Sequence, residues 1–391
     1  MKKITFPAVL SCFVFVAVLV TGFGVGAMAQ TGGLRVAPGV RLPGDSVTRE
    51  ALVGGLRGWI GAMSGPDSLN RYVAEGDRPG TAVLMGQLRA LKGDCWLGGV
   101  TPLDSGHWQI QLNYMSLQHD TPSLQACCTV LARQEGGRCF ISSPLAENTL
   151  SWKQKTIGCC TFHYPGTINV RQAAEFERLV ASYDQRLKIG KPAIDFYCCT
   201  NLLEASKLIG LDYMASFSGF GYSDLSSDYG LHQVIVCGNE WKDGFCTISM
   251  HDMWHGELHR AVSTKVINRP VDEGMAYLYG GSWIVYGWKD ILKMMGDYRV
   301  AHPGADWLAL YKDGTNMIPP PKIIKISYAI NALIVQRLEK DRGFAASLPL
   351  LCCGPKVSGD ANYFAALQGV TGVDEKGFNG YIEGLLKDAL N

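Results

Sequence analysis

Three of the eight histidines of the chain lie within nine residues, in the segment HDMWHGELH at residues 251–259. On a helix, side chains four residues apart lie above one another on one face. Two imidazoles at this spacing can bind the same metal ion of the size of zinc. The segment therefore predicts a helix that carries a metal site, with His251 and His255 as ligands.

The third histidine, His259, leaves a second placement of the metal open. It lies four residues after His255, so a metal could also bind one turn further along the helix. We favour the first pair because Asp252 then follows the first ligand, where the glutamate of an H-E-x-x-H motif accepts a proton from water. Glu257 faces about 200° away from His255 and cannot easily take this role. His259 remains an alternative ligand or a partner of the ligands.

A second segment supplies a candidate third ligand. Glu273 follows His255 by eighteen residues, in the sequence RPVDEGMAY at residues 269–277. The proline predicts a helix start, because its missing N–H costs nothing in the first turn. A carboxylate in this turn would complete a site of two histidines and one glutamate, as in catalytic zinc sites.

The two segments together resemble the gluzincin (peptidase MA-like) metallopeptidases, in which the H-E-x-x-H helix is followed by a helix that carries the third ligand in E-G-x-A-x-Y or a similar sequence. Residues 273–277, EGMAY, match that second element without a gap. The tail, with an apolar helix from Tyr328 to Leu338, is also similar to these peptidases, and the resemblance covers about residues 153–390. Exported bacterial proteins that share H-D-x-W-H and N-R-P-V-D-E-G look similar as well.

The resemblance implies Zn²⁺ bound by His251, His255 and Glu273, a peptide or protein substrate, and Tyr328 as a donor that stabilises an oxyanion. Asp252 stands where the family has glutamate. It is shorter by one C–C bond, roughly 1.5 Å, and a misplacement of about 1 Å can cost on the order of a hundredfold in rate. We therefore expect a zinc-dependent hydrolase with a weak general base. The competing hypothesis is an inactive, peptidase-like binding or structural protein of the cell envelope.

The first residues have the features of a secretory signal peptide. Lys2 and Lys3 precede an almost wholly apolar run, and Ala27-Met28-Ala29 provides small residues before a cut at Gln30. An uncleaved anchor is the alternative, since the run nearly reaches the ~20 residues that span a bilayer. Cleavage of residues 1–29 predicts a periplasmic or secreted protein without a membrane contact. The near balance of 36 basic and 35 acidic residues gives no indication of nucleic-acid binding.

The remaining chain predicts an α+β protein of two domains. In residues 30–152, helical spacing of Leu52, Leu56 and Ile60 is followed by alternating strands around residues 108–112 and 127–131, which indicates a small α+β domain with a cystatin-like or NTF2-like fold as one candidate. Residues 153–391 would form the zincin-like domain, with a short mixed sheet, the active-site helix and a mainly helical C-terminal part.

Within this second domain we expect strands at 161–164, 193–199 and 232–237, and a helix at 170–187. The glycine- and serine-rich residues 216–230 predict a loop. Gly256, inside the histidine helix, costs ~1 kcal/mol relative to alanine, which suggests that another part of the molecule or a substrate approaches it closely.

Twelve cysteines follow the signal peptide, and eight of them form four adjacent pairs. Neighbouring residues of a strand point to opposite faces, so such a pair cannot close on itself without strain. None of the cysteines has C-x-x-C spacing. The favoured interpretation is that most cysteines are small buried apolar residues, with one or two long-range disulfides allowed by export.

Overall fold

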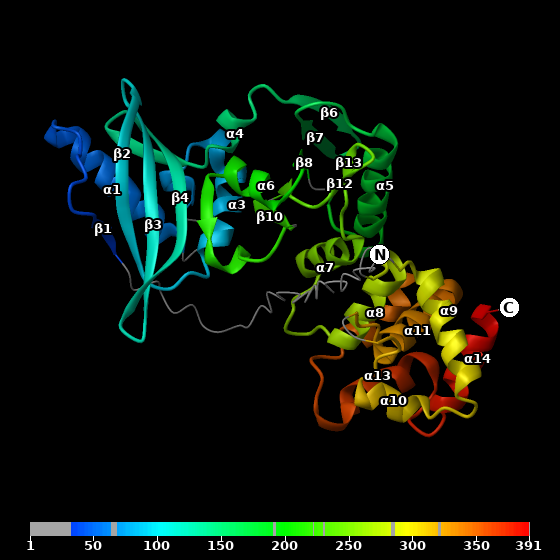
Figure 1. Cartoon of the computed structure of the whole chain (residues 1–391). Coiled ribbons are helices and arrows are strands. Elements are labelled where there is room, and N and C mark those ends of the chain that lie inside the picture. The colour runs from blue at the N-terminus through cyan, green and yellow to red at the C-terminus, as the bar shows by residue number, and fades with distance from the viewer. Residues whose placement is uncertain are drawn as a thin grey trace, which may run out of the picture. The chain divides into compact units, whose positions relative to one another are not determined.

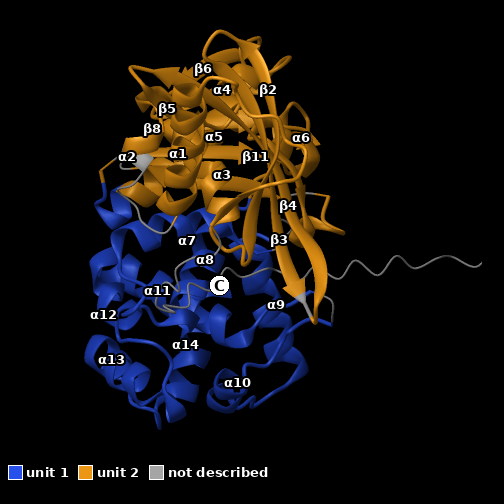
Figure 2. Ribbon diagram, turned by 90° about the vertical axis from the view of Figure 1, so that its left-hand side faces the viewer, with its two compact units in different colours: residues 1–23, 185–189, 249–391 blue, residues 24–184, 190–248 orange. Residues whose placement is uncertain are grey.

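The computed structural model describes residues 33–63, 69–190, 193–221, 223–229, 231–282, 286–319 and 322–390, so the expected signal peptide lies outside the described part. The protein is α+β, as the sequence predicts (Figure 1). The described chain forms two compact units, shown in Figure 2: unit 2 contains residues 33–184 and 190–248, and unit 1 contains 185–189 and 249–390. The expected domain boundary after residue 152 lies inside unit 2.

The larger sheet of unit 2 is a meander in the order β1-β2-β3-β4-β5, with β9 also paired to β4. All its pairs are antiparallel except β1 with β2. The strands are β1 (Leu34–Val36), β2 (Asp94–Asp104), β3 (His107–Gln118), β4 (Thr121–Glu135), β5 (Arg138–Ser142) and β9 (Leu211–Met214). The alternation that predicted this sheet is visible in β4, where every second residue from Ala126 to Ala132 is buried.

Short helices complete this part of unit 2. Leu52, Leu56 and Trp59 on one face of the first helix are fully buried in the same apolar core as the sheet, as the sequence spacing predicts. The helices are α1 (Ser46–Ala62), α2 (Leu69–Tyr72), η2 (Glu75–Asp77), α3 (Arg78–Leu88), α4 (Leu145–Asn148), α6 (Leu202–Leu208) and η3 (Ala215–Phe217).

A second sheet of unit 2 has the order β10-β11-β8-β7-β6. Its strands are β6 (Lys153–Ile157), β7 (Cys160–Tyr164), β8 (Ala193–Cys198), β10 (Asp224–Tyr229) and β11 (His232–Cys237), beside the hairpin β12 (Trp241–Lys242) and β13 (Phe245–Cys246). Strand β10 corrects the expected loop at 216–230. Its serines pair with β11 through backbone hydrogen bonds and Leu225 is buried, so tertiary pairing outweighs a composition typical of loops.

Helix α5 (Val170–Leu187) follows β7 with the bounds that the sequence predicts. Four phenylalanines form a cluster that ties this helix to β7, β8 and β13, with ring centroids 5.2–6.5 Å apart: Phe162, Phe176, Phe196 and Phe245. Edge-on and offset contacts at such distances add to the stabilisation from burial.

Unit 1 is helical from residue 250 onward in its described part, as expected. Its elements are α7 (Met250–Ala261), α8 (Arg269–Gly280), α9 (Trp288–Ala301), α10 (Trp307–Asp313), α11 (Ile326–Arg342), η4 (Phe344–Ser347), α12 (Leu348–Leu351), η5 (Ser358–Asp360), α13 (Ala361–Thr371) and α14 (Phe378–Leu390). Helices α8 and α11 pack closely, because a Cβ on Gly274 would lie 2.6 Å from the Cβ of Asn331.

All twelve cysteines after residue 33 are free, and eight of them are buried. The interpretation as buried apolar residues is therefore confirmed for most of them, and the expected one or two long-range disulfides are not formed. No helix among the described residues combines the length and the apolar character needed to cross a bilayer.

Candidate metal centre

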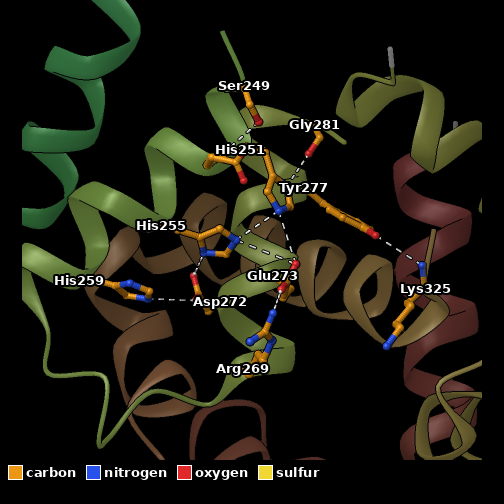
Figure 3. Close-up of polar contacts among 11 residues, drawn as sticks. Ser249, His251, His255, His259, Arg269, Asp272, Glu273, Tyr277, Gly281 and Lys325 are labelled. Carbon is orange, nitrogen blue, oxygen red and sulfur yellow. Dashed lines mark hydrogen bonds and ion pairs between the residues drawn. The ribbon is translucent and has the colours of Figure 1, made fainter. Parts of the chain in front are cut away.

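Helix α7 presents His251 and His255 beside its buried face, on the side that contacts α8. The helix begins after Ser249, whose side chain accepts a hydrogen bond from the amide of Asp252, a standard N-cap. Trp254 and Leu258 are fully buried. His251 and His255 are partly exposed. Their rings extend from the helix toward the carboxylates of α8 (Figure 3).

Helix α8 carries the two carboxylates of the centre, Asp272 and Glu273, both buried. Gly280 brings the end of this helix against the start of α7, since a Cβ there would lie 2.3 Å from the backbone nitrogen of His251. A Cβ on Gly256 would meet open space, so the neighbouring strand expected there is wrong for the described residues. Gly280, not Gly256, is the glycine required by packing at this site.

Three ligand atoms converge between the two helices. The Nε2 atoms of His251 and His255 lie 3.2 Å apart, and Oε2 of Glu273 lies 3.4 Å from the first and 4.0 Å from the second. A triangle with these sides has a point about 2.1 Å from every corner, which agrees with the 2.0–2.2 Å bonds of zinc to imidazole and carboxylate. The sequence-predicted ligands therefore lie close enough together to hold one metal ion.

Hydrogen bonds fix which nitrogen of each ring is free. Nδ1 of His251 lies 2.8 Å from the carbonyl oxygen of Gly281, which can only accept, so this nitrogen carries the proton. Nδ1 of His255 donates in the same way to Oδ1 of Asp272, also at 2.8 Å. Both Nε2 atoms then present lone pairs to the same space. At a separation of 3.2 Å these lone pairs need a cation between them, either a metal ion or a proton.

Glu273 is divided between two partners. Its Oε1 accepts a hydrogen bond of 3.0 Å from Arg269, which leaves Oε2 for the centre. Burial alone would raise the pKa of Glu273, but the hydrogen bond with His251 and the charges of His255 and Arg269 outweigh it and lower the pKa below the ordinary value. Burial likewise opposes the charged form of His251, yet Glu273 and the carbonyl of Gly281 raise its pKa. The centre is thus built for a positive charge.

Asp272 is a site residue that the sequence did not assign. Its Oδ1 orients His255, and its Oδ2 lies 3.6 Å from Nε2 of His259. Burial opposes its ionisation, but the hydrogen bonds to these histidines hold the pKa of Asp272 at about 2. Carboxylates that orient ligand histidines are typical of zinc sites. The sequence offered one indication of this role, which is that Asp272 directly precedes Glu273. The contact of Asp272 with His255 could not be predicted, because it depends on how α7 and α8 pack.

His259 can also be grouped with His255 and Asp272 as possible ligands. In that group the contact of His255 with Asp272, at 2.8 Å, has the length of a hydrogen bond. The side chain of His259 is 42% exposed, whereas that of Glu273 is 11% exposed. The geometry therefore favours the group of His251, His255 and Glu273, and His259 contacts Asp272 on the side away from these ligands.

The two predicted catalytic residues differ in their positions. Asp252 is exposed in the first turn of α7, and its charge contributes to the raised pKa of His251. Tyr328 on α11 is half-buried and contacts the ring of Tyr277 edge-on, with centroids 5.7 Å apart. Tyr277 in turn lies 5.7 Å from the ring of His251, so Tyr277 is the tyrosine that contacts a ligand directly (Figure 3).

None of the known family models matches this chain, and no curated protein sequence does either. The interpretation of the site therefore depends on its geometry and on the residue types that form it.

Proposed function

We propose that the protein is a zinc-dependent hydrolase of the exported compartment that acts on peptides, with His251, His255 and Glu273 as metal ligands. The observation that carries the proposal is the convergence of Nε2 of His251, Nε2 of His255 and Oε2 of Glu273 on one point, while hydrogen bonds occupy the other polar atom of each ligand.

Zinc, when bound, supplies a Lewis acid that polarises a carbonyl group and makes water acidic enough to lose a proton near neutral pH. Residues around the ligands orient them. Asp272 and the carbonyl of Gly281 set the orientations of the two rings, and Arg269 binds Oε1 of Glu273 so that Oε2 points to the centre. Asp252, one residue after the first ligand, is our candidate for accepting the proton from water.

A second candidate function is peptide binding without turnover. The observation that favours it is the identity of Asp252, which is one methylene shorter than the glutamate that serves as base in H-E-x-x-H enzymes. Because the carboxylate of Asp252 reaches less far, the metal site would bind a peptide but cleave it slowly or not at all.

Two measurements test the proposal on the full chain. Equilibrium dialysis against micromolar zinc at neutral pH should give about one zinc per chain, because the two groups of possible ligands share His255 and can hold only one ion at a time. Asp252→Glu should raise peptide turnover by up to about a hundredfold, since it restores roughly 1.5 Å of reach and a misplacement of about 1 Å can already cost that much. The matched control is Asp297→Glu, the same change at an exposed position of α9.

Zinc binding with no turnover in either Asp252 or Asp252→Glu protein would favour the binding function. A wild-type chain that retains no zinc under these conditions would contradict both candidates.

A further inference from the structure

A small pocket of about 190 Å³ lies in unit 1 and shares a wall residue with the metal centre. The shared residue is Arg269, which lines the pocket and donates to Oε1 of Glu273 at 3.0 Å. Tyr328 lines the pocket as well, and its ring contacts Tyr277, which contacts His251. A molecule that fills the pocket would therefore lie within one or two side chains of the ligands.

The pocket carries an excess of positive charge. Three of its lining residues are cations: Arg269, Lys325 and Lys356. Lys356 is paired with Asp360 at 3.4 Å, and Arg269 is paired with Glu273. The ammonium group of Lys325 lies 5.2 Å from the ring centroid of Tyr328, and no carboxylate of the described residues lies within 4.0 Å of it. Two carboxylates thus face three cations, so the pocket attracts an anion.

Hydrogen-bond donors reinforce this charge. Helix α11 begins at the pocket, with Ser327 and Tyr328 in the lining, and Lys325 at its N-cap position provides no side-chain cap. The amides of the first turn of a 17-residue helix favour a negative group. Tyr311 also lines the pocket and is only 2% exposed.

We propose that this pocket binds a carboxylate group of the substrate and thereby selects peptides that carry a carboxylate close to the bond to be cleaved. The assignment of the ligand as part of a substrate rests on the proposed hydrolase function, whereas the binding of a carboxylate depends on the pocket alone. Arg269 still has free N–H donors beyond the one given to Glu273. Lys325 supplies the unpaired charge.

The test measures carboxylate binding to the zinc-free full chain by calorimetry, so that the ligand cannot bind through the metal. The probes are N-acetylglycine, which carries a carboxylate, and N-acetylglycinamide, its neutral counterpart. Wild-type protein should bind the first and not the second. Lys325→Gln should weaken binding roughly tenfold, as expected for removal of one unpaired cation from a partly enclosed site.

The matched control is Lys340→Gln, which removes the same charge at an exposed position near the other end of α11. It should bind N-acetylglycine as the wild type does. Lys356→Gln serves as a second variant in case Lys325→Gln does not fold, and circular dichroism checks each chain. Equal binding of the amide, equal weakening by Lys325→Gln and Lys340→Gln, or no saturable binding by the wild type would each overturn the proposal.

A third probe, N-acetylglutamate with its α-carboxylate amidated, identifies the source of the group. Tighter binding of N-acetylglycine would assign the pocket to the C-terminal carboxylate of a peptide, and tighter binding of the third probe would assign it to an acidic side chain; both results support the pocket. Zinc content is measured separately on the same proteins. If the wild-type protein binds the carboxylate probe but does not retain zinc in this separate measurement, the hydrolase function is contradicted and the pocket is still established.

Discussion

Two clusters in different units use the same residue types and arrange them in opposite ways. In unit 2, His163 on β7 and His232 on β11 flank Asp195 on β8, and both rings donate from Nε2 to its carboxylate, at 2.8 and 2.6 Å. In unit 1, His255 donates to Asp272 from Nδ1, and its Nε2 lies 3.2 Å from that of His251.

The difference shows what distinguishes a metal site from a polar cluster. Both oxygens of Asp195 are occupied by histidine donors, so this cluster is satisfied by hydrogen bonds within the protein. In unit 1 the hydrogen bonds of Asp272 and the Gly281 carbonyl take one nitrogen of each ring and direct the other toward Glu273. Residue types alone would not separate the two clusters, whereas the convergence of two Nε2 atoms and a carboxylate oxygen in unit 1 does.

The largest effect that this comparison predicts is loss of zinc in one cluster only. His255→Ala removes one of three ligands and should weaken zinc binding by more than roughly a hundredfold, beyond the cost of losing an orienting partner. His232→Ala makes the same chemical change in unit 2 and should retain the wild-type zinc affinity. Zinc competition with a chromophoric chelator measures both. Similar losses in the two variants would show that the clusters do not differ as we describe.

The next effect concerns the carboxylates that contact the histidines. Asp272→Asn keeps an oxygen that can accept from His255 but removes the charge, so zinc affinity should fall about 10- to 100-fold. Asp195→Asn should leave zinc affinity unchanged. The same chelator competition provides the measurement, with unfolding monitored to exclude collapse of either chain. An unchanged affinity in Asp272→Asn would mean that the orientation of His255 does not depend on this contact.

A third prediction tests the packing that places His251. Gly280→Ala puts a Cβ against the backbone of α7 and should cost about 1–3 kcal/mol of unfolding free energy, as overpacking does, with weaker zinc binding. Gly256→Ala adds a methyl group to open space and should stabilise the protein by up to ~1 kcal/mol. Urea denaturation measures both free energies. Equal effects of the two substitutions would contradict the assignment of Gly280 as the packing glycine.

The sequence predicted the parts of the centre that follow from local periodicity. Spacing of four placed His251 and His255 on one helix face, and Pro270 marked the start of the helix that carries Glu273, as the structure has them. These inferences need only the repeat of a helix and the conformational restriction of proline. The helix α5 and the strands β7, β8 and β11 were predictable for the same reason.

The parts that the sequence did not reveal depend on contacts between distant segments. Asp272 acquires its role from the packing of α7 on α8, and the pocket beside Arg269 is formed by residues of four separate segments. Asp195 lies 32 residues from His163 and 37 from His232, and only the order of the strands brings them together. No neighbouring strand approaches Gly256 among the described residues, because the position of a residue on a helix gives no information about which surface is covered.

The smallest effect that we predict is the pH dependence of the stability that the cluster of His163, Asp195 and His232 contributes. Burial alone would raise the pKa of Asp195, but the hydrogen bonds from His163 and His232 outweigh it and lower the pKa below its ordinary value of 3.8. A lowered pKa in the folded state stabilises the protein above the pKa of the unfolded state, and this contribution is lost as the pH falls through the folded value. Wild-type protein should therefore exceed Asp195→Asn by about 1 kcal/mol near neutral pH, and the difference should shrink only below pH 3.8. Urea denaturation of both chains between pH 7 and the acid range measures it, and a difference that stays constant well below pH 3.8 would show that Asp195 is not held as an ionised acceptor between the two rings.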